Sequence, residues 1–313
     1  MIRTSEQAFE DAIEATLLTG GPDALRPPEI RTKETDASYQ TRVHLYPVGG
    51  YHKRSCKGAE YVASLALIPR DLFDFIQASQ PKMWAKYLKI HKGNVAEAKQ
   101  QFQQKLAKDL NRRGTLALLR GKGFRLEGCT FKLIYFKPAS RLNPETQTLY
   151  QANRFSVLRQ LYYKPRSANK PQSGPSIDLG LFINGLPIFT VELKNQLTLQ
   201  TVEDSKRQYR KDRDPKEPLL AYGRCLAHFA VDTNDVYVTS HLRGEETTFL
   251  PLNQGYGGGA GNEPSALGFA TSYLWEQLWA KNSVLNLIEH FIHEIELEDD
   301  KGNKTGEKRL IFP

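Results

Sequence analysis

The feature that most constrains the fold is a pair of apolar runs joined by a short turn. IDLGLFI begins at Ile177 and IFTVELK begins at Ile188, with Asn184-Gly185 at the start of the link between them. Asn-Gly between two apolar runs is typical of a two-residue hairpin, because both turn positions need a positive φ. We therefore predict two paired strands that are built to be buried.

Helical and strand patterns alternate around this hairpin. The helical segments predicted from apolar spacing and capping residues are 4–18, 71–110, 201–212 and 270–294. The further predicted strands are 43–48, 60–68, 115–121, 128–136, 154–163, 226–232 and 236–240. This alternation predicts an α/β fold with a mixed β-sheet flanked by helices. We expect one domain over residues 1–295 and an exposed linker over 296–313, where LEDDKGNKTGEK is strongly polar.

Composition narrows the partners and the compartment. The net charge of +8 and the pI of about 9.2 suit a polyanionic partner, although a charge that serves only solubility explains them equally well. The cysteines Cys56, Cys129 and Cys225 are few, odd in number and far apart, which fits a reducing cytoplasm. No apolar run approaches the roughly 20 residues that span a bilayer, so we expect no membrane association.

Positive charge is concentrated between residues 81 and 125. Twelve basic residues lie between Lys82 and Arg125, opposed only by Glu97 and Asp109. Solvated helix faces are one explanation for such lysines. The imbalance over the whole segment favours a surface that faces phosphates.

The chemistry is concentrated in the hairpin. Glu192 and Lys194 alternate along one strand and share a face, and Asp178 begins the strand before it. Charges at the end of a buried strand are costly unless they pair with each other or bind a metal, and a structural ion pair remains one alternative. The other is Mg²⁺, which prefers carboxylates and carbonyls, held by Asp178, Glu192 and the Leu193 carbonyl. Lys194 would then orient the attacking water or stabilise the developing oxyanion.

These residues form the pattern D-x13-E-x-K, which resembles the PD-(D/E)xK nuclease superfamily, with Ile177 in place of the usual proline. The string IDLGLFINGLPIFTVELKN, together with RRGTLALLRGKGF and QYRKDRDPKEPLL, resembles the N-terminal nuclease domain of the restriction (R) subunit of type I restriction–modification enzymes. The resemblance implies a restriction-endonuclease-like fold and Mg²⁺-dependent cleavage of double-stranded DNA. It also implies modification and specificity subunits as partners.

The resemblance extends to further site residues. A glutamate on the first helix joins the metal site in that family, and either Glu6 or Glu10 can take this place, with Glu10 favoured. Gln208 corresponds to the glutamine of a Q-x-x-x-Y pattern, although the tyrosine is displaced to position 209. The predicted DNA contacts, for which solvated basic helices are the alternative, are Arg112, Arg113, Arg120, Lys122, Arg207 and Arg210.

A complete R subunit would continue into an ATP-driven motor. The chain contains no G-x-x-x-x-G-K-[ST] loop, so we expect a fragment in which ATP binding belongs to an absent motor region. Two other hypotheses stay open at this point. One is a repair or recombination nuclease of the same superfamily, and the other is a catalytically silent module for DNA binding or subunit docking.

Overall fold

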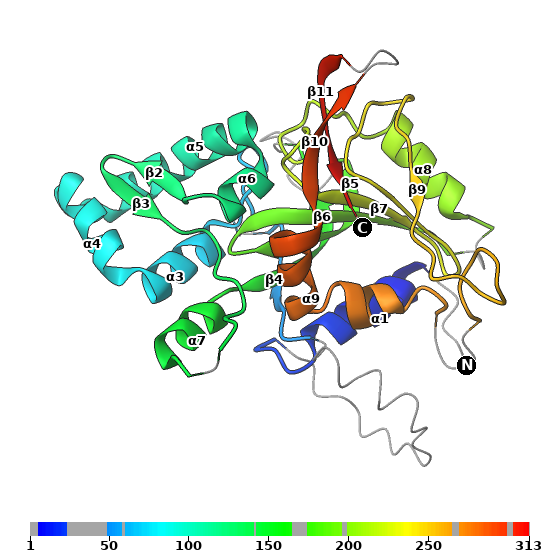
Figure 1. The fold of residues 1–313 in the computed structure, drawn as a ribbon, viewed down its shortest axis with the longest axis horizontal. Helices are drawn as coiled ribbons and strands as arrows, with labels where there is room; N and C mark the ends of the chain where they lie inside the picture. The colour runs from blue at the N-terminus through cyan, green and yellow to red at the C-terminus, as the bar shows by residue number, and fades with distance from the viewer. Residues whose placement is uncertain are drawn as a thin grey trace.

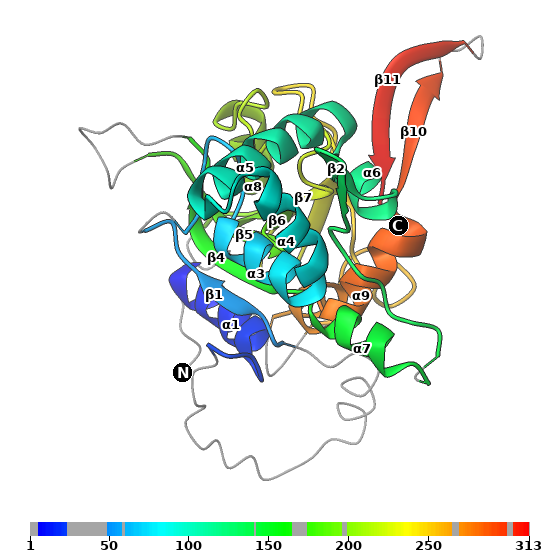
Figure 2. The same ribbon diagram turned by 90° about the vertical axis from the view of Figure 1, so that its left-hand side faces the viewer.

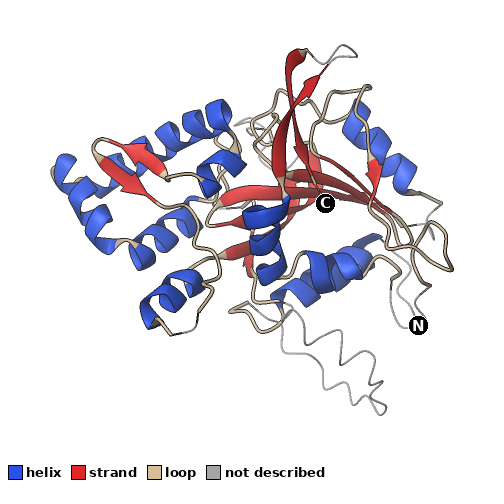
Figure 3. Cartoon of the chain, viewed as in Figure 1, coloured by secondary structure: helices blue, strands red, loops and turns tan. Residues whose placement is uncertain are grey.

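A mixed seven-stranded sheet forms the centre of the molecule (Figures 1 and 3). The computed structural model describes residues 6–23, 49–57, 60–140, 142–164, 174–195, 199–264, 269–298 and 303–312. The strands in spatial order are β1 (His52–Arg54), β4 (Phe155–Tyr162), β5 (Ser176–Ile183), β6 (Leu186–Leu193), β7 (Ala227–Val231), β8 (Val236–Thr239) and β9 (Leu250–Pro251). The pairs β1–β4 and β6–β7 are parallel and the other neighbours are antiparallel. The predicted α/β class with a mixed sheet is confirmed.

Helices bury both faces of this sheet. On one face α1 (Glu6–Leu18) lies beside η2 (Leu274–Leu278), where Phe9 meets Trp275 edge to face. The same core contains side chains from α9 (Lys281–Asn286) and η3 (Leu287–Phe291), so the helical segment predicted over 270–294 consists of three short helices, the last of which ends at Phe291. On the other face, α8 (Val202–Lys211) adds Val202 and Tyr209 to a second, smaller core.

A helical lobe lies to one side of the sheet and joins β1 to β4 (Figure 1). Its elements are α3 (Pro69–Ser79), α4 (Pro81–Ile90), α5 (Val95–Arg113), α6 (Thr115–Arg120), the hairpin β2 (Phe124–Leu126) and β3 (Cys129–Phe131), and α7 (Pro144–Gln151). Rings from three helices and β3 form its centre, where Phe102 contacts Phe73, Trp84, Tyr87 and Phe131. This aromatic centre is continuous with the main core that covers the sheet.

Several predicted elements in this region were wrong. The helical pattern predicted over 71–110 is present but divides into three helices, because Pro81 starts α4 and Asn94 caps α5 by accepting from the Glu97 amide. The strand over 115–121 is helix α6, which follows Gly114 at a positive φ. The predicted strand over 60–68 is a turn with one bridge, and the strand over 128–136 is confirmed only at β3. The predicted strand at 43–48 lies outside the described residues.

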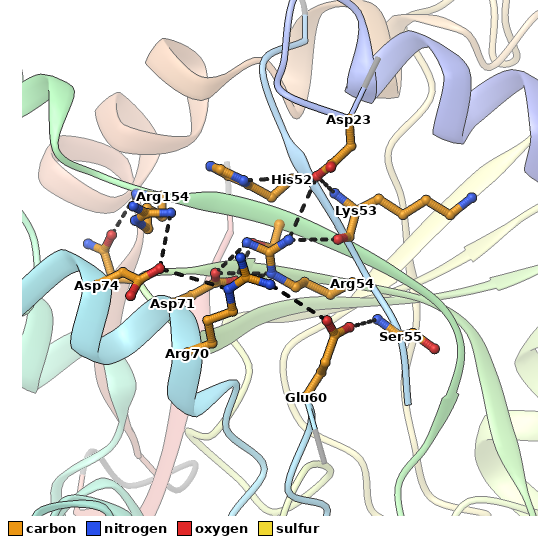
Figure 4. Close-up of polar contacts among 12 residues, drawn as sticks. Asp23, His52, Lys53, Arg54, Ser55, Glu60, Arg70, Asp71, Asp74 and Arg154 are labelled. Atoms are coloured by element: carbon orange, nitrogen blue, oxygen red, sulfur yellow. Dashed lines mark hydrogen bonds and ion pairs between the residues drawn. The ribbon is translucent and has the colours of Figure 1, made fainter. Parts of the chain in front are cut away.

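A buried ion pair fastens the lobe to the edge of the sheet (Figure 4). The Arg54 guanidinium on β1 donates to the Asp71 carboxylate on α3, with Nη2 2.7 Å from Oδ1. Asp71 also accepts from the Ser156 hydroxyl on β4 at 2.5 Å. Asp71 and Ser156 are fully buried and Arg54 nearly so, so these contacts hold α3, β1 and β4 together in a medium where they are strong.

The predicted hairpin is present and contains a bulge. Asn184 and Gly185 have φ values of 50° and 78°, as a two-residue type I′ turn requires. Beside the turn Phe182 pairs with Pro187, but the next pair along the strands is Leu181 with Phe189, so one extra residue enters β6. The shifted register continues to the pair of Leu179 with Val191. Extending that register by one residue sets Asp178 opposite Glu192.

The segment expected to be an exposed linker is mostly a strand. Strands β10 (His293–Glu298) and β11 (Lys304–Ile311) form an antiparallel hairpin that projects from the body (Figure 2). Ion pairs cross it, with Lys308 Nζ 3.1 Å from Glu294. Leu310 is buried, and its carbonyl accepts from the Ser240 hydroxyl. The polar composition of residues 296–313 therefore does not indicate a linker without secondary structure, because opposite charges on paired strands stabilise a hairpin. None of the described helices is long and apolar enough to cross a membrane.

Candidate metal centre

Three of the predicted residues meet at the ends of β5 and β6. The Asp178 carboxylate accepts a hydrogen bond from the Leu193 amide, with Oδ2 2.7 Å from the nitrogen. The Lys194 amide donates to the Val231 carbonyl, which keeps the chain beside β7 beyond the end of β6. Asp178, Glu192 and Lys194 are each less than a tenth exposed. The structure thus brings Asp178 to Glu192 and Lys194, as the sequence predicted.

Glu192 is the most unusual of these groups electrostatically. Its side chain is fully buried, and burial raises its pKa to about 8, with the neighbouring Asp178 carboxylate adding to the effect. Arg213 and Lys194 oppose the shift but do not cancel it. Oε1 lies 2.6 Å from the Arg213 Nε, whereas Oε2 has no hydrogen-bond partner among the described residues.

Lys194 pairs with neither of the two acids on the strands. Its Nζ lies 3.2 Å from Oε1 of Glu6, on the first turn of α1. The Glu6 side chain is 32% exposed, whereas that of Lys194 is 7% exposed. The ammonium is therefore held from the helix side of the site, not by a Glu192–Lys194 or Asp178–Lys194 pair as the structural alternative assumed.

Glu10 reaches the same region but is clamped. Its Oε2 accepts from Nε and Nη2 of Arg159 at 2.9 and 2.7 Å, and its Oε1 accepts from Gln160. Burial raises the pKa of Glu10, and the nearby Asp178 carboxylate raises it further against the opposing hydrogen bond from Arg159. Glu10 therefore lies close enough to sense Asp178, while the side chains of β4 occupy its oxygens. The choice between Glu6 and Glu10 as the helix ligand stays a prediction.

Helix α8 packs against the strand that carries Glu192. The Tyr209 hydroxyl contacts the Thr190 hydroxyl at 2.8 Å, and Thr190 also contacts Nδ1 of His228 on β7. Burial raises the pKa of Tyr209 and the Glu192 carboxylate raises it further. Gln208, the predicted catalytic glutamine, has a buried Oε1 that lacks a hydrogen-bond partner within the described segments. Its role stays a prediction.

Two arginines of this site were not identified from the sequence as parts of it. Arg213 lies in the basic stretch that follows Gln208, and Arg159 lies in a predicted strand to which no role was assigned. Arg159 also donates to Asp11 at 2.6 Å, so a single guanidinium ties α1 to β4. Neither residue carries a signal in its spacing, because each is paired with an acid that is far away in the chain. The signal available in the sequence was the acid itself: a glutamate such as Glu192 within an apolar strand needs a nearby cation.

The described part of the chain contains no preassembled group of three or more His, Cys, Asp or Glu side chains suited to a metal ion. The residues present still fit a hard divalent cation. The unpartnered Glu192 Oε2 is a buried acceptor, and Asp178 uses only Oδ2 in its hydrogen bond to the backbone. Mg²⁺ is commonly bound through one or two protein carboxylates, with waters and substrate phosphates completing its shell.

The predicted DNA contacts separate into groups. Arg112 and Arg113 both pair with Asp109 on α5. Arg120 donates to the carbonyls of Ile292 and Glu289 at 2.6 Å each, so it joins α6 to the end of η3 and has a role inside the fold. These three residues are not free surface cations.

The remaining three differ in exposure. Arg207 is 64% exposed and pairs with Asp204 one turn away. Arg210 donates to the Thr247 carbonyl and lies over the Phe249 ring. Lys122 is exposed and has no ion pair with a described residue. Of the six, Lys122 is thus the side chain that the structure leaves open to a phosphate.

The family to which these residues belong follows from a sequence comparison. A family model described as "Type I restriction enzyme R protein N terminus" matches residues 77–247, which is more than half of the chain. The match includes the lobe from the end of α3 onward, β4 to β8 and the residues Asp178, Glu192, Lys194 and Gln208. A comparison with curated proteins found no match. On the strength of the family match, the chain belongs to the N-terminal region of the R protein of type I restriction enzymes.

Proposed function

We propose that this chain is a Mg²⁺-dependent endonuclease region that hydrolyses phosphodiester bonds of double-stranded DNA within a type I restriction enzyme. The observation that carries this proposal is the buried, unpartnered Glu192 Oε2 beside the Asp178 carboxylate. A buried carboxylate such as Glu192, whose pKa is raised by burial and by the neighbouring Asp178 carboxylate, is costly to folding. A bound cation would relieve that cost, whereas a module that only binds DNA has no use for it.

Asp178 and Glu192 are the side chains that would hold the cation, together with the Leu193 carbonyl. Glu10 is the further candidate on α1, provided that it is released from Arg159. When bound, Mg²⁺ supplies a water of lowered pKa and neutralises charge on the scissile phosphate. The chain's own contribution is to place two carboxylates at adjacent strand ends and to keep bulk water away from them.

Lys194 is the proposed proton-handling and charge-stabilising group. An ammonium has only donors, so it is not a metal ligand. It can orient the attacking water through a hydrogen bond or stabilise the negative charge that develops at the phosphate oxygens. Glu6 holds the ammonium at 3.2 Å, and because the pair uses one acceptor, two of its three protons remain for water or substrate.

The helical lobe supplies a surface suited to the DNA backbone. Several exposed cations on α4 and on the β2–β3 hairpin form no ion pair with a described residue: Lys82, Lys86, Lys89, Lys122, Arg125 and Lys132. The acid on this hairpin, Glu127, contacts His91 at 3.2 Å. Cations without an ion-pair partner on one lobe favour sequence-independent contacts to phosphates. Recognition of a target sequence would then belong to another subunit.

The test is cleavage of plasmid DNA in Mg²⁺ by the wild type and by Asp178→Asn and Glu192→Gln, in the assembled enzyme. Calorimetric titration with Mg²⁺ on the same preparations reports metal binding directly. We expect both variants to lose cleavage and metal binding while remaining folded. Glu145→Gln is the matched control, because Glu145 is exposed on α7. Full cleavage by either site variant would favour the silent docking module.

A further inference from the structure

Arg213 belongs to a basic stretch of the sequence, yet its side chain is buried. It lies two residues after the end of α8 and is only 8% exposed. Its guanidinium lies over the Tyr163 ring, 5.6 Å from the centroid. The Tyr163 hydroxyl donates to the Asp212 carbonyl at 3.0 Å, and the Asp212 amide donates to the Gln208 carbonyl as the helix C-cap. The backbone around Arg213 is therefore fixed from two sides.

The contact between Arg213 and Glu192 is one-sided. Nε lies 2.6 Å from Oε1, and no nitrogen of the guanidinium reaches Oε2 within hydrogen-bond distance. In the usual two-bond arrangement, an arginine would occupy both oxygens of the carboxylate. Here one oxygen is held and the other remains buried without a partner among the described residues. That remaining oxygen is the one available to a cation.

We propose that Arg213 is a positioning residue of the metal site, which holds the Glu192 carboxylate so that Oε2 stays available to the cation. The inference rests on the proposed function. Residues that hydrogen-bond a metal ligand without touching the metal orient that ligand, and their loss commonly weakens metal binding 10–100-fold. Arg213 acts through Glu192 and does not itself contact the cation.

A second role for Arg213 needs to be distinguished from this one. Arg213 also provides a positive charge beside a buried acid, and any cation at this place would do so. Lysine keeps the charge, but its ammonium is a compact donor on a flexible stem without the planar, directed Nε–H. Arg213→Lys therefore leaves the electrostatic balance in place and removes the directional hydrogen bond.

The experiment measures Mn²⁺ binding by calorimetry without DNA, because Mn²⁺ shares the preference of Mg²⁺ for carboxylate oxygens. Melting in the presence of a chelator reports the stability of the metal-free fold. For Arg213→Lys we expect a 10–100-fold rise in Kd for Mn²⁺ with a nearly unchanged melting temperature. Arg70→Lys is the matched control, since Arg70 is an exposed arginine on α3, and its Kd should equal that of the wild type.

Tyr163→Phe provides a second and gentler perturbation. It keeps the ring beneath the guanidinium and removes the hydroxyl that holds the Asp212 carbonyl. We expect a smaller rise in the Mn²⁺ Kd, about 3–10-fold, as a partial loss of the ligand-orienting contacts would produce. This variant decides the matter if Arg213→Lys does not fold.

The possible outcomes separate the inference from the proposed function. If Glu192→Gln binds Mn²⁺ as the wild type does, the proposed metal site itself fails. If Glu192→Gln loses binding while Arg213→Lys and Tyr163→Phe bind normally, the metal site stands and the positioning role is overturned. Weaker Mn²⁺ binding in the folded Arg213→Lys variant, with Arg70→Lys unchanged, supports the role.

Discussion

Replacing Glu192 by glutamine should stabilise the metal-free protein at alkaline pH. Glutamine has nearly the same shape, and its carbonyl can still accept from the Arg213 Nε. It cannot ionise. Because the Glu192 side chain is fully buried, ionisation there removes a charge from water at a cost that the Arg213 contact only partly offsets. The cost appears only as the pH rises.

The magnitude follows from the pKa of Glu192 in the two states. Burial raises it to about 8 in the folded chain, against an ordinary value of 4.5. Between these values the folded state retains a proton that the unfolded state has released, so the free energy of unfolding falls as the pH rises. At about 1.4 kcal/mol for each pH unit, the loss from pH 5 to pH 8 is about 3–4 kcal/mol. The pKa of Arg213 is raised, so Arg213 stays charged throughout and contributes equally at both ends.

Urea unfolding at pH 5, 6, 7 and 8 in the presence of a chelator measures this difference. We expect Glu192→Gln to match the wild type within about 1 kcal/mol at pH 5 and to exceed its stability by about 3 kcal/mol at pH 8. Glu10, whose pKa is also raised, is present in both proteins, so its contribution largely cancels. Mn²⁺ at pH 8 should narrow the gap by stabilising only the wild type. A stability difference that does not change with pH would refute the reasoning.

Three further perturbations test other parts of the structure. Lys194→Ala should leave metal binding unchanged and lower cleavage at least about 100-fold. The free energy of unfolding should stay within about 1 kcal/mol of the wild type, because the Glu6 partner of Lys194 is partly exposed. A variant that melts early but cleaves normally would contradict a catalytic role. Replacing Lys82 and Lys89 by alanine should reduce the slope of log binding constant against log salt concentration for DNA by about 1–2, more than Arg112→Ala reduces it. Equal slopes for these variants would mean that DNA binds another surface. Gly185→Ala should cost more than about 1 kcal/mol in urea unfolding, because φ is 78° and a Cβ would lie 2.4 Å from a backbone carbonyl; wild-type stability would contradict this view of the turn.

Local sequence determined much of the central scaffold. The Asn184-Gly185 turn needs no tertiary contact to favour a hairpin, because only residues tolerant of a positive φ suit both positions. Helix α8 was recognisable from its own residues, where Thr201 and Asp204 complete a capping box. The apolar runs of β5 to β8 identified buried strands. These features depend on neighbours within a few residues, which a single sequence displays.

Short elements away from the sheet were harder to predict. Residues 115–120 have the composition of a strand but form α6, where the Thr115 amide and hydroxyl bind the Gly223 and Arg224 carbonyls. The segment from 296 to 313 has the composition of a polar linker, but most of its described residues lie in β10 and β11, which pair with each other. In both cases distant partners decide the conformation, and weak local propensity yields to them.

The candidate site shows the same division more sharply. The motif identified Asp178, Glu192 and Lys194, but a plain two-residue hairpin would have set Val191, not Glu192, opposite Asp178. The extra residue in β6 shifts the register by one, which brings the two acids onto one face. Arg213, just after α8, and Arg159, on β4, then reach the site. Sequence specified which groups are chemically capable, whereas tertiary structure decided which of them meet, because a register and a long-range ion pair depend on contacts between segments far apart in the chain.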